Sequence, residues 1–427
     1  MTTATTAEAD IVVIGAGHAG MQLVDSLRSE GFTGTIALME AQGGVPYQRP
    51  PLSKEFMASD PDASDDSAKQ GVVLRGPNFF AEKRVDFVPG RAVASVNRQS
   101  HLLTLNDGSR FGYGRLVFAT GAINRALTVP GAELDGVVGL KTLADAGQLR
   151  ERLRQAERVV VIGAGFIGLE FAAVARASGC AVTVMEFNDR PMKRALSATT
   201  GNYCAAAHRE RGITLLLGEA VDSLPGDGAK VNAVRTVSGM TIPADLVVVG
   251  VGVAPADELA QAAGLVIDNG ISVDGMLATS DPDISAIGDC ASYPIAGTGA
   301  RVRLESVQNA TEHARTLARV LTGHGSAYDA VPWFWSVQGG IRLQIAGLFA
   351  PGDVEVTLGS PEQGRFSVLL FRDGRLVAVE SVNRAADHVA ARRVLSSETA
   401  CQALTAEDAA DPDFDFKQFS RSIMVDA

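Results

Sequence analysis

Cysteine and histidine are scarce in this sequence. Its 427 residues include four cysteines and six histidines. The cysteines form no C-x-x-C pair and follow no spacing typical of metal ligands, and the histidines are equally dispersed. The sequence therefore predicts neither a disulfide framework nor a metal site.

Excess positive charge and long apolar runs are also lacking. The formal net charge is −11 at pH 7, which argues against general nucleic-acid binding or adhesion to an anionic membrane. No apolar run approaches the roughly 18 residues that a membrane-spanning helix needs. The first ten residues, MTTATTAEAD, lack the basic start of a secretory signal. We expect a soluble, cytoplasmic protein without nucleic-acid or membrane partners.

Glycine, in contrast, is abundant, and its arrangement carries the first positive signal. Two stretches read alike: IVVIGAGHAG over 11–20 and VVVIGAGFIG over 159–168. Each is an apolar, β-branched run followed by G-x-G-x-x-G and a helical pattern. A second apolar run then ends in an acid, Glu40 or Glu186. This combination, found twice, predicts two dinucleotide-binding units of the Rossmann type.

The fingerprint gives each glycine a physical role. The first permits a tight turn, the second lets the backbone approach a pyrophosphate, and the third allows close packing of helix on strand. In that order the pairs are Gly15 and Gly163, Gly17 and Gly165, and Gly20 and Gly168. The phosphates would lie at a helix N-terminus, where N–H groups and the helix dipole favour negative charge. One unit could instead be a relic that binds nothing.

The acids predict cofactor preference. Glu40 and Glu186 would accept hydrogen bonds from a ribose 2′-hydroxyl, and Glu186 would repel a 2′-phosphate, so the second unit should prefer NADH to NADPH. Three cations close behind weaken that preference: Arg190, Lys193 and Arg194. Beyond the two units, helical periodicity covers 303–321 and alternating strands with turns cover 331 to about 393. Residues 59–71 are poor in apolar residues and predict a loop.

The order of the motifs resembles one family. The two GAG motifs are joined by VPYQRPPLSK (45–54), ATGA (119–122), G-V-G-x-x-P (250–255), SAIGDCA (285–291), RLESVQNA (303–310) and VPWFWS (331–336). The chain is similar in this series to FAD-dependent ferredoxin reductases of bacterial cytochrome P450 and Rieske dioxygenase systems, the class of putidaredoxin reductase and rhodocoxin reductase. The resemblance runs nearly from end to end.

The resemblance implies an α/β fold of glutathione-reductase-like architecture, with two Rossmann-like domains and a C-terminal α+β domain. The FAD-binding domain would comprise 1–125 and 251–330, split around an NADH-binding domain at 126–250. The C-terminal cap would cover 331–427. FAD and NADH are the implied cofactors.

The resemblance also implies catalytic roles for Lys54, Glu170 and Trp335. Lys54 would reach toward flavin N5 and pair with Glu170, and Trp335 would lie between flavin and acceptor. A cation beside the reactive edge stabilises the negative charge of a reduced flavin, and a carboxylate keeps the lysine charged. The structural alternatives are a solvated loop lysine, an ordinary helix glutamate and a core tryptophan.

Further flavin contacts are implied at Arg49 in the stiff PYQRPPLSK loop, at Asp289 on the ribityl chain, and at Val307 and Gln308. Those last two would begin a helix whose N-terminus points at flavin N1 and the C2 carbonyl. The remaining implied cofactor contacts are His18, Ala19, Thr120, Gly121, Ile167 and Gly252.

The implied function is hydride transfer from NADH to FAD, followed by single-electron transfer to a [2Fe–2S] ferredoxin that feeds a cytochrome P450 or Rieske oxygenase. Disulfide reductases and peroxidases of this architecture are disfavoured, because the chain has no cysteine pair and AQGGVPY (41–47) has no cysteine. Two alternatives stay open: a flavin oxidoreductase with dioxygen or a quinone as acceptor, and a redox-sensing binding protein like the apoptosis-inducing factors. The acidic net charge argues against the basic surface of the latter.

One segment departs from the family pattern. Where relatives carry an acid and an aromatic after FWS, this chain has Val337, Gly339 and Gly340. The change removes a charge and an aromatic surface near the implied electron route. An acidic ferredoxin suggests a basic docking patch, and we hypothesise one drawn from Arg303, Arg342 and Arg384.

Overall fold

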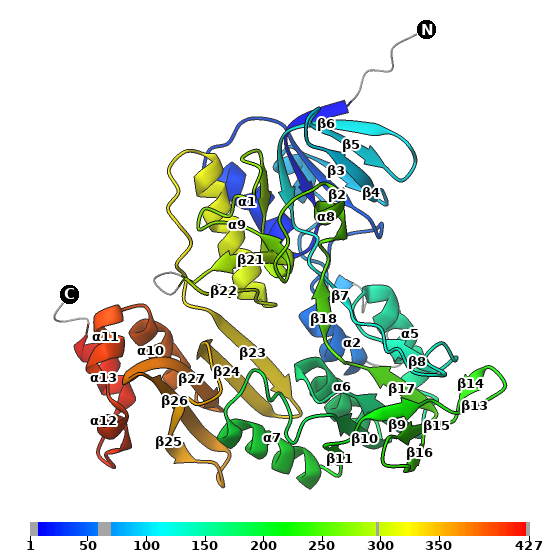
Figure 1. Ribbon diagram of the computed structural model, residues 1–427, viewed down its shortest axis with the longest axis vertical. Helices are drawn as coiled ribbons and strands as arrows, with labels where there is room; N and C mark the ends of the chain where they lie inside the picture. The colour runs from blue at the N-terminus through cyan, green and yellow to red at the C-terminus, as the bar shows by residue number, and fades with distance from the viewer. Residues whose placement is uncertain (1–6, 59–69, 296–298, 424–427) are drawn as a thin grey trace. The chain divides into compact units, whose positions relative to one another are not determined.

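A computed structural model describes residues 7–58, 70–295 and 299–423 (Figure 1). The predicted loop at 59–71 lies almost wholly outside these residues. The chain divides into two compact units. Unit 1 contains 1–48, 69–123 and 253–330, and unit 2 contains 49–68, 124–252 and 331–427.

Unit 1 is built on a seven-stranded sheet, ordered β3-β2-β1-β6-β5-β4 with β20 also paired to β6. The strands are β1 (Ala7–Ile14), β2 (Ile36–Glu40), β3 (Val85–Pro89), β4 (Val93–Asn97), β5 (Leu102–Leu105), β6 (Arg110–Phe118) and β20 (Ile284–Ala286). Strands β3, β2, β1, β6 and β20 pair in parallel, and β4 and β5 add an antiparallel extension. In β1 and β2 the residues over 11–14 and 36–39 are apolar and buried, as expected where helices cover a parallel sheet.

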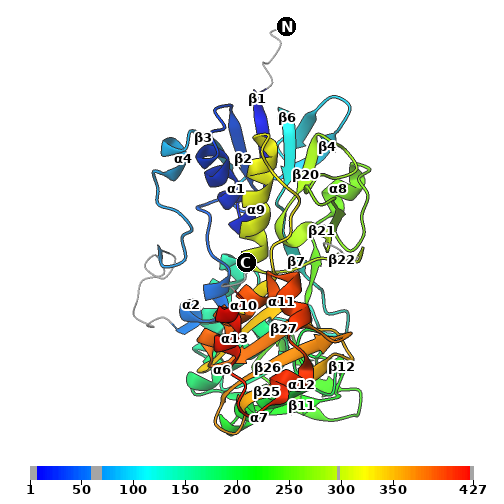
Figure 2. The ribbon, with the colours of Figure 1, turned by 90° about the vertical axis from the view of Figure 1, so that its left-hand side faces the viewer.

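Two long helices cover this sheet. Helices α1 (His18–Ser29) and α9 (Val307–Leu321) lie side by side in both views (Figures 1 and 2). The predicted apolar face of α9 is buried at Ala310, Ala314 and Leu317. The other elements whose residues fall mainly in this unit are α4 (Phe79–Glu82), β7 (Ala122–Asn124), β18 (Val253–Pro255), α8 (Glu258–Ala262), β19 (Ile271–Ser272), η2 (Gly288–Cys290), β21 (Ala291–Pro294) and β22 (Arg301–Val302).

Unit 2 contains a second parallel sheet, ordered β11-β10-β9-β17-β8. Its strands are β8 (Val137–Gly139), β9 (Arg158–Ile162), β10 (Ala181–Glu186), β11 (Thr214–Leu217) and β17 (Leu246–Val249). Its helices are α5 (Leu143–Leu153), α6 (Phe166–Ala177) and α7 (Ala198–Glu210). Short antiparallel pieces are β12 (Val221–Ser223), β13 (Gly226–Asp227), β14 (Lys230–Val231), β15 (Ala233–Thr236) and β16 (Thr241–Pro243). The segment η1 (Pro50–Ser53) and α2 (Glu55–Ala58) also belong to unit 2.

The C-terminal part of unit 2 is an antiparallel sheet ordered β23-β24-β27-β26-β25. Its strands are β23 (Trp333–Gln338), β24 (Ile341–Gly347), β25 (Val354–Ser360), β26 (Arg365–Arg372) and β27 (Arg375–Val382). Helices α10 (Ala385–Leu395), α11 (Glu398–Ala403) and α12 (Ala406–Ala410) pack on the sheet, and α13 (Phe416–Ser422) packs on α10 (Figure 2). In the part of the chain that the structure describes, no helix is long and apolar enough to cross a membrane.

Candidate active site

The first glycine turn connects β1 to α1. Gly15 has φ +111°, and a Cβ there would collide with the Ala119 carbonyl. A Cβ on Gly20 would collide with the carbonyl of Gly15. Gly17, by contrast, has no atom within 4 Å of an added Cβ. The outer glycines are therefore required by the protein's own backbone, and the middle one borders open space that a ligand can enter.

The second turn, between β9 and α6, repeats this geometry. Gly163 has φ +104°, with the Gly250 carbonyl where a Cβ would be. A Cβ on Gly168 would strike the Gly163 carbonyl, whereas one on Gly165 would meet nothing within 4 Å. The N-cap residues of α1 and α6 are the glycines Gly17 and Gly165, which have no side chain to cap the helix. Both helix N-termini thus suit the phosphate role predicted from the sequence.

The two acids end their strands as predicted, but their partners differ. Glu40 accepts the backbone N–H groups of Gln42 and Gly43 at 2.8 and 2.6 Å. Glu186 accepts the N–H of Ala164, inside its own glycine turn, at 2.9 Å. Its other oxygen accepts the backbone and side-chain N–H groups of Asn188 at 2.8 and 2.6 Å. Glu186 is therefore hydrogen-bonded to the same glycine turn whose nucleotide it is predicted to bind.

Three loops of unit 1 meet at one edge of its sheet. Ile14, Phe118 and Ala286 are in register across β1, β6 and β20, at the carboxyl ends of those strands. The segments that follow carry the first glycine turn, Thr120 with Gly121, and Asp289. Ligands of open α/β sheets bind at such carboxyl edges. The fold thus brings these predicted contacts together from three distant parts of the sequence.

Local hydrogen bonds fix two of these segments. The Thr120 hydroxyl donates to the Ala256 carbonyl at 2.6 Å. The N–H of Gly288, next to Asp289, donates to Nδ1 of the fully buried His313 at 3.2 Å. Burial lowers the pKa of His313 to about 3, so this histidine is a neutral acceptor.

Helix α9 begins at the predicted position, with Ser306 as its N-cap and Val307 as its first residue. The next residue, Gln308, has a buried side-chain oxygen that no described residue hydrogen-bonds. A buried acceptor without a donor is costly unless a ligand supplies one. This orphaned oxygen and the open space at Gly17 fit an FAD molecule, which carries an imide N–H and a pyrophosphate.

In unit 2, Lys54 and Glu170 form a buried ion pair. Lys54 Nζ lies 2.7 Å from Glu170 Oε2, and the two side chains are 14% and 4% exposed. Two hydroxyls complete the carboxylate's partners: Ser53 donates to Oε2 at 2.6 Å and Ser336 donates to Oε1 at 2.7 Å. The predicted partners are thus together, and Lys54 is not a solvated loop lysine. The sequence prediction did not include either serine.

The other predicted residues of unit 2 are placed less sharply. Arg49 donates to the Lys141 carbonyl at 2.7 Å. Trp335 is half-buried in β23, with its ring centroid 6.1 Å from that of Trp333. Ile167 is exposed in the first turn of α6, and Gly252 has φ +96°. In unit 1, His18 and Ala19 are the first two residues of α1.

The Gly339–Gly340 pair has a local structural cause. It forms the two-residue loop between β23 and β24, where Gln338 pairs with Ile341, and its φ values are +56° and +96°. A two-residue hairpin loop with both φ values positive is the turn type that glycine favours most. A Cβ on Gly339 would also lie 3.2 Å from that of Ala173. The two glycines are therefore explained by the hairpin itself.

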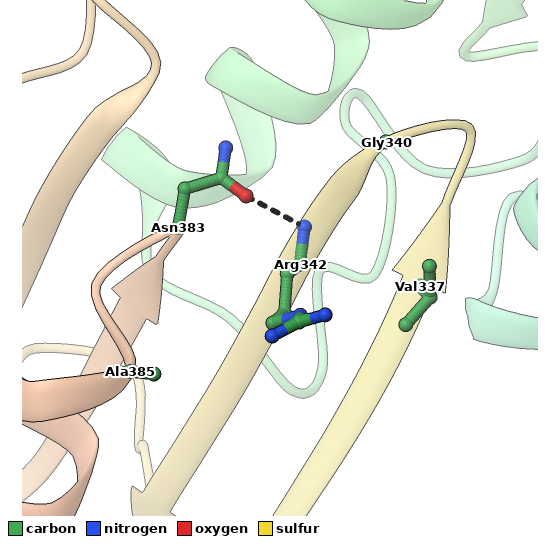
Figure 3. Close-up of a pocket in the computed structure, with 5 residues that line it drawn as sticks. All are labelled: Val337, Gly340, Arg342, Asn383 and Ala385. Atoms are coloured by element: carbon green, nitrogen blue, oxygen red, sulfur yellow. Dashed lines mark hydrogen bonds between the residues drawn. The ribbon is translucent and has the colours of Figure 1, made fainter.

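The three arginines of the hypothesised docking patch are not equivalent. The Arg303 side chain is only 7% exposed and pairs with Glu305 at 2.7 Å, and Arg384 pairs with Asp387 at 2.7 Å. Arg342 is exposed and, among the described residues, has no side-chain ion pair. It lines a pocket of about 310 Å³ (Figure 3). The other lining residues are Val337, Gly340, Asn383 and Ala385. This arrangement leaves Arg303 and Arg384 as poor candidates for a docking charge.

All four cysteines are free and buried: Cys180, Cys204, Cys290 and Cys401. Burial raises the pKa of the Cys290 thiol. The described residues also contain no cluster of three or more His, Cys, Asp or Glu side chains that could hold a metal ion. The redox chemistry of this site therefore has no thiol pair to draw on.

Comparison with known proteins gives consistent matches. Residues 9–314 match the family model of the pyridine nucleotide-disulphide oxidoreductases, and 333–420 match that of a reductase C-terminal domain. The chain is 49% identical to rhodocoxin reductase of Rhodococcus erythropolis, over 95% of this chain and 93% of that protein.

Two solved structures are similar over nearly the whole chain. A ferredoxin reductase from Rhodopseudomonas palustris gives a TM-score of 0.91 at 45% identity, covering 96% of this chain and all of that one. Putidaredoxin reductase in its covalent complex with putidaredoxin gives a TM-score of 0.90 at 34% identity, covering 98% and 99%. These matches confirm the predicted resemblance and the predicted fold class.

Proposed function

This chain belongs to the pyridine nucleotide-disulphide oxidoreductase family, and on that premise we propose that it is an NADH-dependent flavoprotein ferredoxin reductase. It takes a hydride from NADH onto FAD and passes single electrons to a [2Fe–2S] ferredoxin, which feeds a cytochrome P450 or Rieske oxygenase. The observation that carries the proposal is the pair of equivalent glycine turns in a chain without a redox cysteine pair. Relatives named rhodocoxin reductase and putidaredoxin reductase support the acceptor class.

The residues of unit 1 are suited to hold FAD. Gly17 and the N-terminus of α1 would receive the pyrophosphate, and Glu40 the adenosine ribose. Asp289 would bind the ribityl chain, and the orphaned oxygen of Gln308 would accept a flavin N–H. FAD supplies the ability to accept a hydride and release electrons singly, and the protein supplies orientation and charge.

Lys54 and Glu170 would adjust the charge beside the flavin. A lysine ammonium held at a reactive edge stabilises the negative charge that reduction creates there. The Glu170 carboxylate, 2.7 Å from the Lys54 ammonium, pairs with it and fixes its direction. Fixing the cation before reaction avoids the cost of reorganising solvent around it.

The second turn would bind NADH. Gly165 would face the pyrophosphate, and Glu186, fastened to Ala164, would accept the ribose 2′-hydroxyl. We assign NADH binding to 126–250, FAD binding to 1–125 with 251–330, and the cap to 331–427. We also place the protein in the cytoplasm, where NADH is available and thiols such as its four free cysteines stay reduced.

The deciding experiment is steady-state NADH oxidation by the purified yellow protein with a [2Fe–2S] ferredoxin, dioxygen or ferricyanide under identical conditions. We expect rapid, saturable ferredoxin reduction that weakens with added salt, because partner encounter is steered by charge. Fast ferricyanide reduction with several [2Fe–2S] ferredoxins ignored would keep hydride uptake and overturn the acceptor. The search for another acceptor would then begin at Val337 and the hairpin glycines.

A further inference from the structure

A chain of buried polar side chains runs from Glu170 into the C-terminal sheet and on to helix α7, all within unit 2. Ser336 donates to Glu170 Oε1 at 2.7 Å. Gln338 Nε2 donates to the Ser336 hydroxyl oxygen at 3.1 Å, and Gln338 Oε1 lies 3.1 Å from His208 Nε2. Ser336, Gln338 and His208 are fully buried. Unpaired polar groups are costly in a protein interior, so the direction of each hydrogen bond in such a series constrains the direction of the next.

The charge on Glu170 determines the direction of every bond in this chain. A carboxylate facing an ammonium at 2.7 Å is ionised and can only accept, so the single Ser336 proton goes to Glu170. The Ser336 oxygen must then accept, which requires the amide nitrogen of Gln338 to face it. The amide oxygen of Gln338 therefore faces His208, and an amide oxygen can only accept. His208 must carry its proton on Nε2.

The far end of the chain agrees with this order. His208 Nδ1 is buried and has no hydrogen-bond partner among the described residues, so the single proton of a neutral ring is better placed on Nε2, where Gln338 Oε1 accepts it. Burial lowers the pKa of His208, and the nearby Arg211 lowers it further, so the ring is neutral. A neutral ring with its proton on Nε2 needs no partner charge in this interior.

We propose that Ser336, Gln338 and His208 are positioning residues: they form a one-way series of donors that holds the Glu170 carboxylate, and through it Lys54, in a single geometry. This inference rests on the proposed role of Lys54 beside the flavin. The series also links the cap to the lysine, because Ser336 and Gln338 belong to β23 and His208 belongs to α7. A displacement of β23 would therefore move the Ser336 hydroxyl, and through its hydrogen bond to Glu170 it would change the position of Lys54.

The first test reads the proton on His208 by ¹H–¹⁵N NMR of the imidazole nitrogens in the holoprotein. Six histidines make assignment practical, with His208→Asn identifying the signal. We expect the Nε2–H tautomer in the wild type and loss of that single tautomer in Gln338→Met. A wild-type His208 with its proton on Nδ1, or a tautomer unchanged in Gln338→Met, would overturn the directed series. This readout does not depend on catalysis.

The second test measures the flavin midpoint potential and the rate of flavin reduction at saturating NADH. Ser336→Ala should shift the potential to a more negative value and slow reduction about tenfold, the usual scale for one hydrogen bond to a charged group. Gln338→Met removes a hydrogen bond to the neutral Ser336 hydroxyl and should change both quantities in the same direction by a smaller factor. NADH affinity should stay unchanged. The matched control is Ser367→Ala, another buried serine of the same sheet, hydrogen-bonded to Ser381 and Asp387. It should leave both quantities at wild-type values.

Equal effects of Ser336→Ala and Ser367→Ala would mean general loosening of the sheet and would overturn the positioning role. Wild-type potential and rate in both Ser336→Ala and Gln338→Met would overturn it as well. If the wild-type flavin were not reduced by NADH, the proposed function would fail instead, whereas the NMR result would still decide the direction of the series.

Discussion

The two glycine turns are copies in backbone and differ in side chains. Gly15 N–H donates to the Met39 carbonyl at 2.9 Å, and Gly163 N–H to that of Met185 at 2.7 Å. The strand beyond is joined identically, by Ala119 N–H to Ile14 and Gly250 N–H to Ile162, both at 2.8 Å. The backbone geometry that the two turns share is the one that binds the pyrophosphate of a dinucleotide in the Rossmann fingerprint.

The difference appears five residues after each middle glycine. In α1 that position is Gln22, whose amide donates to Ser26 at 2.9 Å. In α6 it is Glu170, buried and paired with Lys54. The first helix thus carries a neutral side chain at this position and the second a carboxylate, so the proposed charge control beside the flavin belongs to the second helix alone. The predictions below test that division.

Gly17→Val should have the largest effect. A Cβ there meets no protein atom within 4 Å, so the fold should survive, but the branched methyls would occupy the pyrophosphate space. We expect protein with wild-type circular dichroism, no yellow colour and no NADH oxidation. Absorbance at the flavin maximum after gel filtration measures this. A folded variant that stayed yellow would contradict the placement of FAD at the first turn.

Gly165→Val is the matched change in the second turn, where an added Cβ again meets no protein atom within 4 Å. Here the flavin should remain bound, and dithionite should still reduce it. Reduction by NADH should be lost, because the valine side chain occupies the pyrophosphate site of the second turn and leaves that of the first turn free. Anaerobic titration with each reductant separates the two turns. Loss of flavin in both glycine variants would contradict the proposal that the first turn binds FAD and the second binds NADH.

Lys54→Met tests the added charge. Removing a preorganised cation should slow flavin reduction by NADH about 100-fold. It should also destabilise the fold by about 3 kcal/mol, because Glu170 would be left buried without its partner. Stopped-flow reduction and urea unfolding report the two effects. The control is Gln22→Met in the first helix, which should leave the reduction rate unchanged, and a slow Gln22→Met would erase the contrast between the helices.

The sequence predicted the shared part of the turns well. Their geometry depends on local backbone demands, such as the positive φ of Gly15 and Gly163, and glycine records those demands directly. The fold class followed for the same reason, since strand, turn and helix lie within one short segment. The Lys54–Glu170 pair, 116 residues apart in sequence, was reached only through the family resemblance.

Side-chain direction was the part that could not be predicted. Ser336 and Gln338 point inward from β23 while Val337 points outward, the reverse of an ordinary half-exposed strand. The only signal in the sequence is the alternation of polar and apolar residues over 336–338, which does not say which face is buried. The sequence shows that Gly339 and Gly340 replace an acid and an aromatic residue, but only the structure shows that their positive φ values form a hairpin turn. The direction of a side chain and the conformation of a turn depend on the residues that surround them in the fold, which sequence spacing does not reveal.

Glu186→Ala should have the smallest effect and concerns the acids. Removing the carboxylate removes the repulsion of a 2′-phosphate, so the preference for NADH over NADPH in kcat/KM should narrow by about tenfold, the scale of one hydrogen bond to a charged group. NADH use should also weaken, because Ala164 N–H loses its acceptor and the turn loosens. Glu40→Ala, the counterpart, should weaken flavin retention and leave the NADH/NADPH ratio unchanged, since Glu40 belongs to the first turn and accepts N–H groups of its own loop. Steady-state assays with ferricyanide and both nucleotides measure the ratio independently of ferredoxin.

An unchanged ratio in Glu186→Ala would mean that the cations that follow β10 discriminate between NADH and NADPH. Among them, Arg190 donates to backbone carbonyls and Lys193 pairs with Asp189.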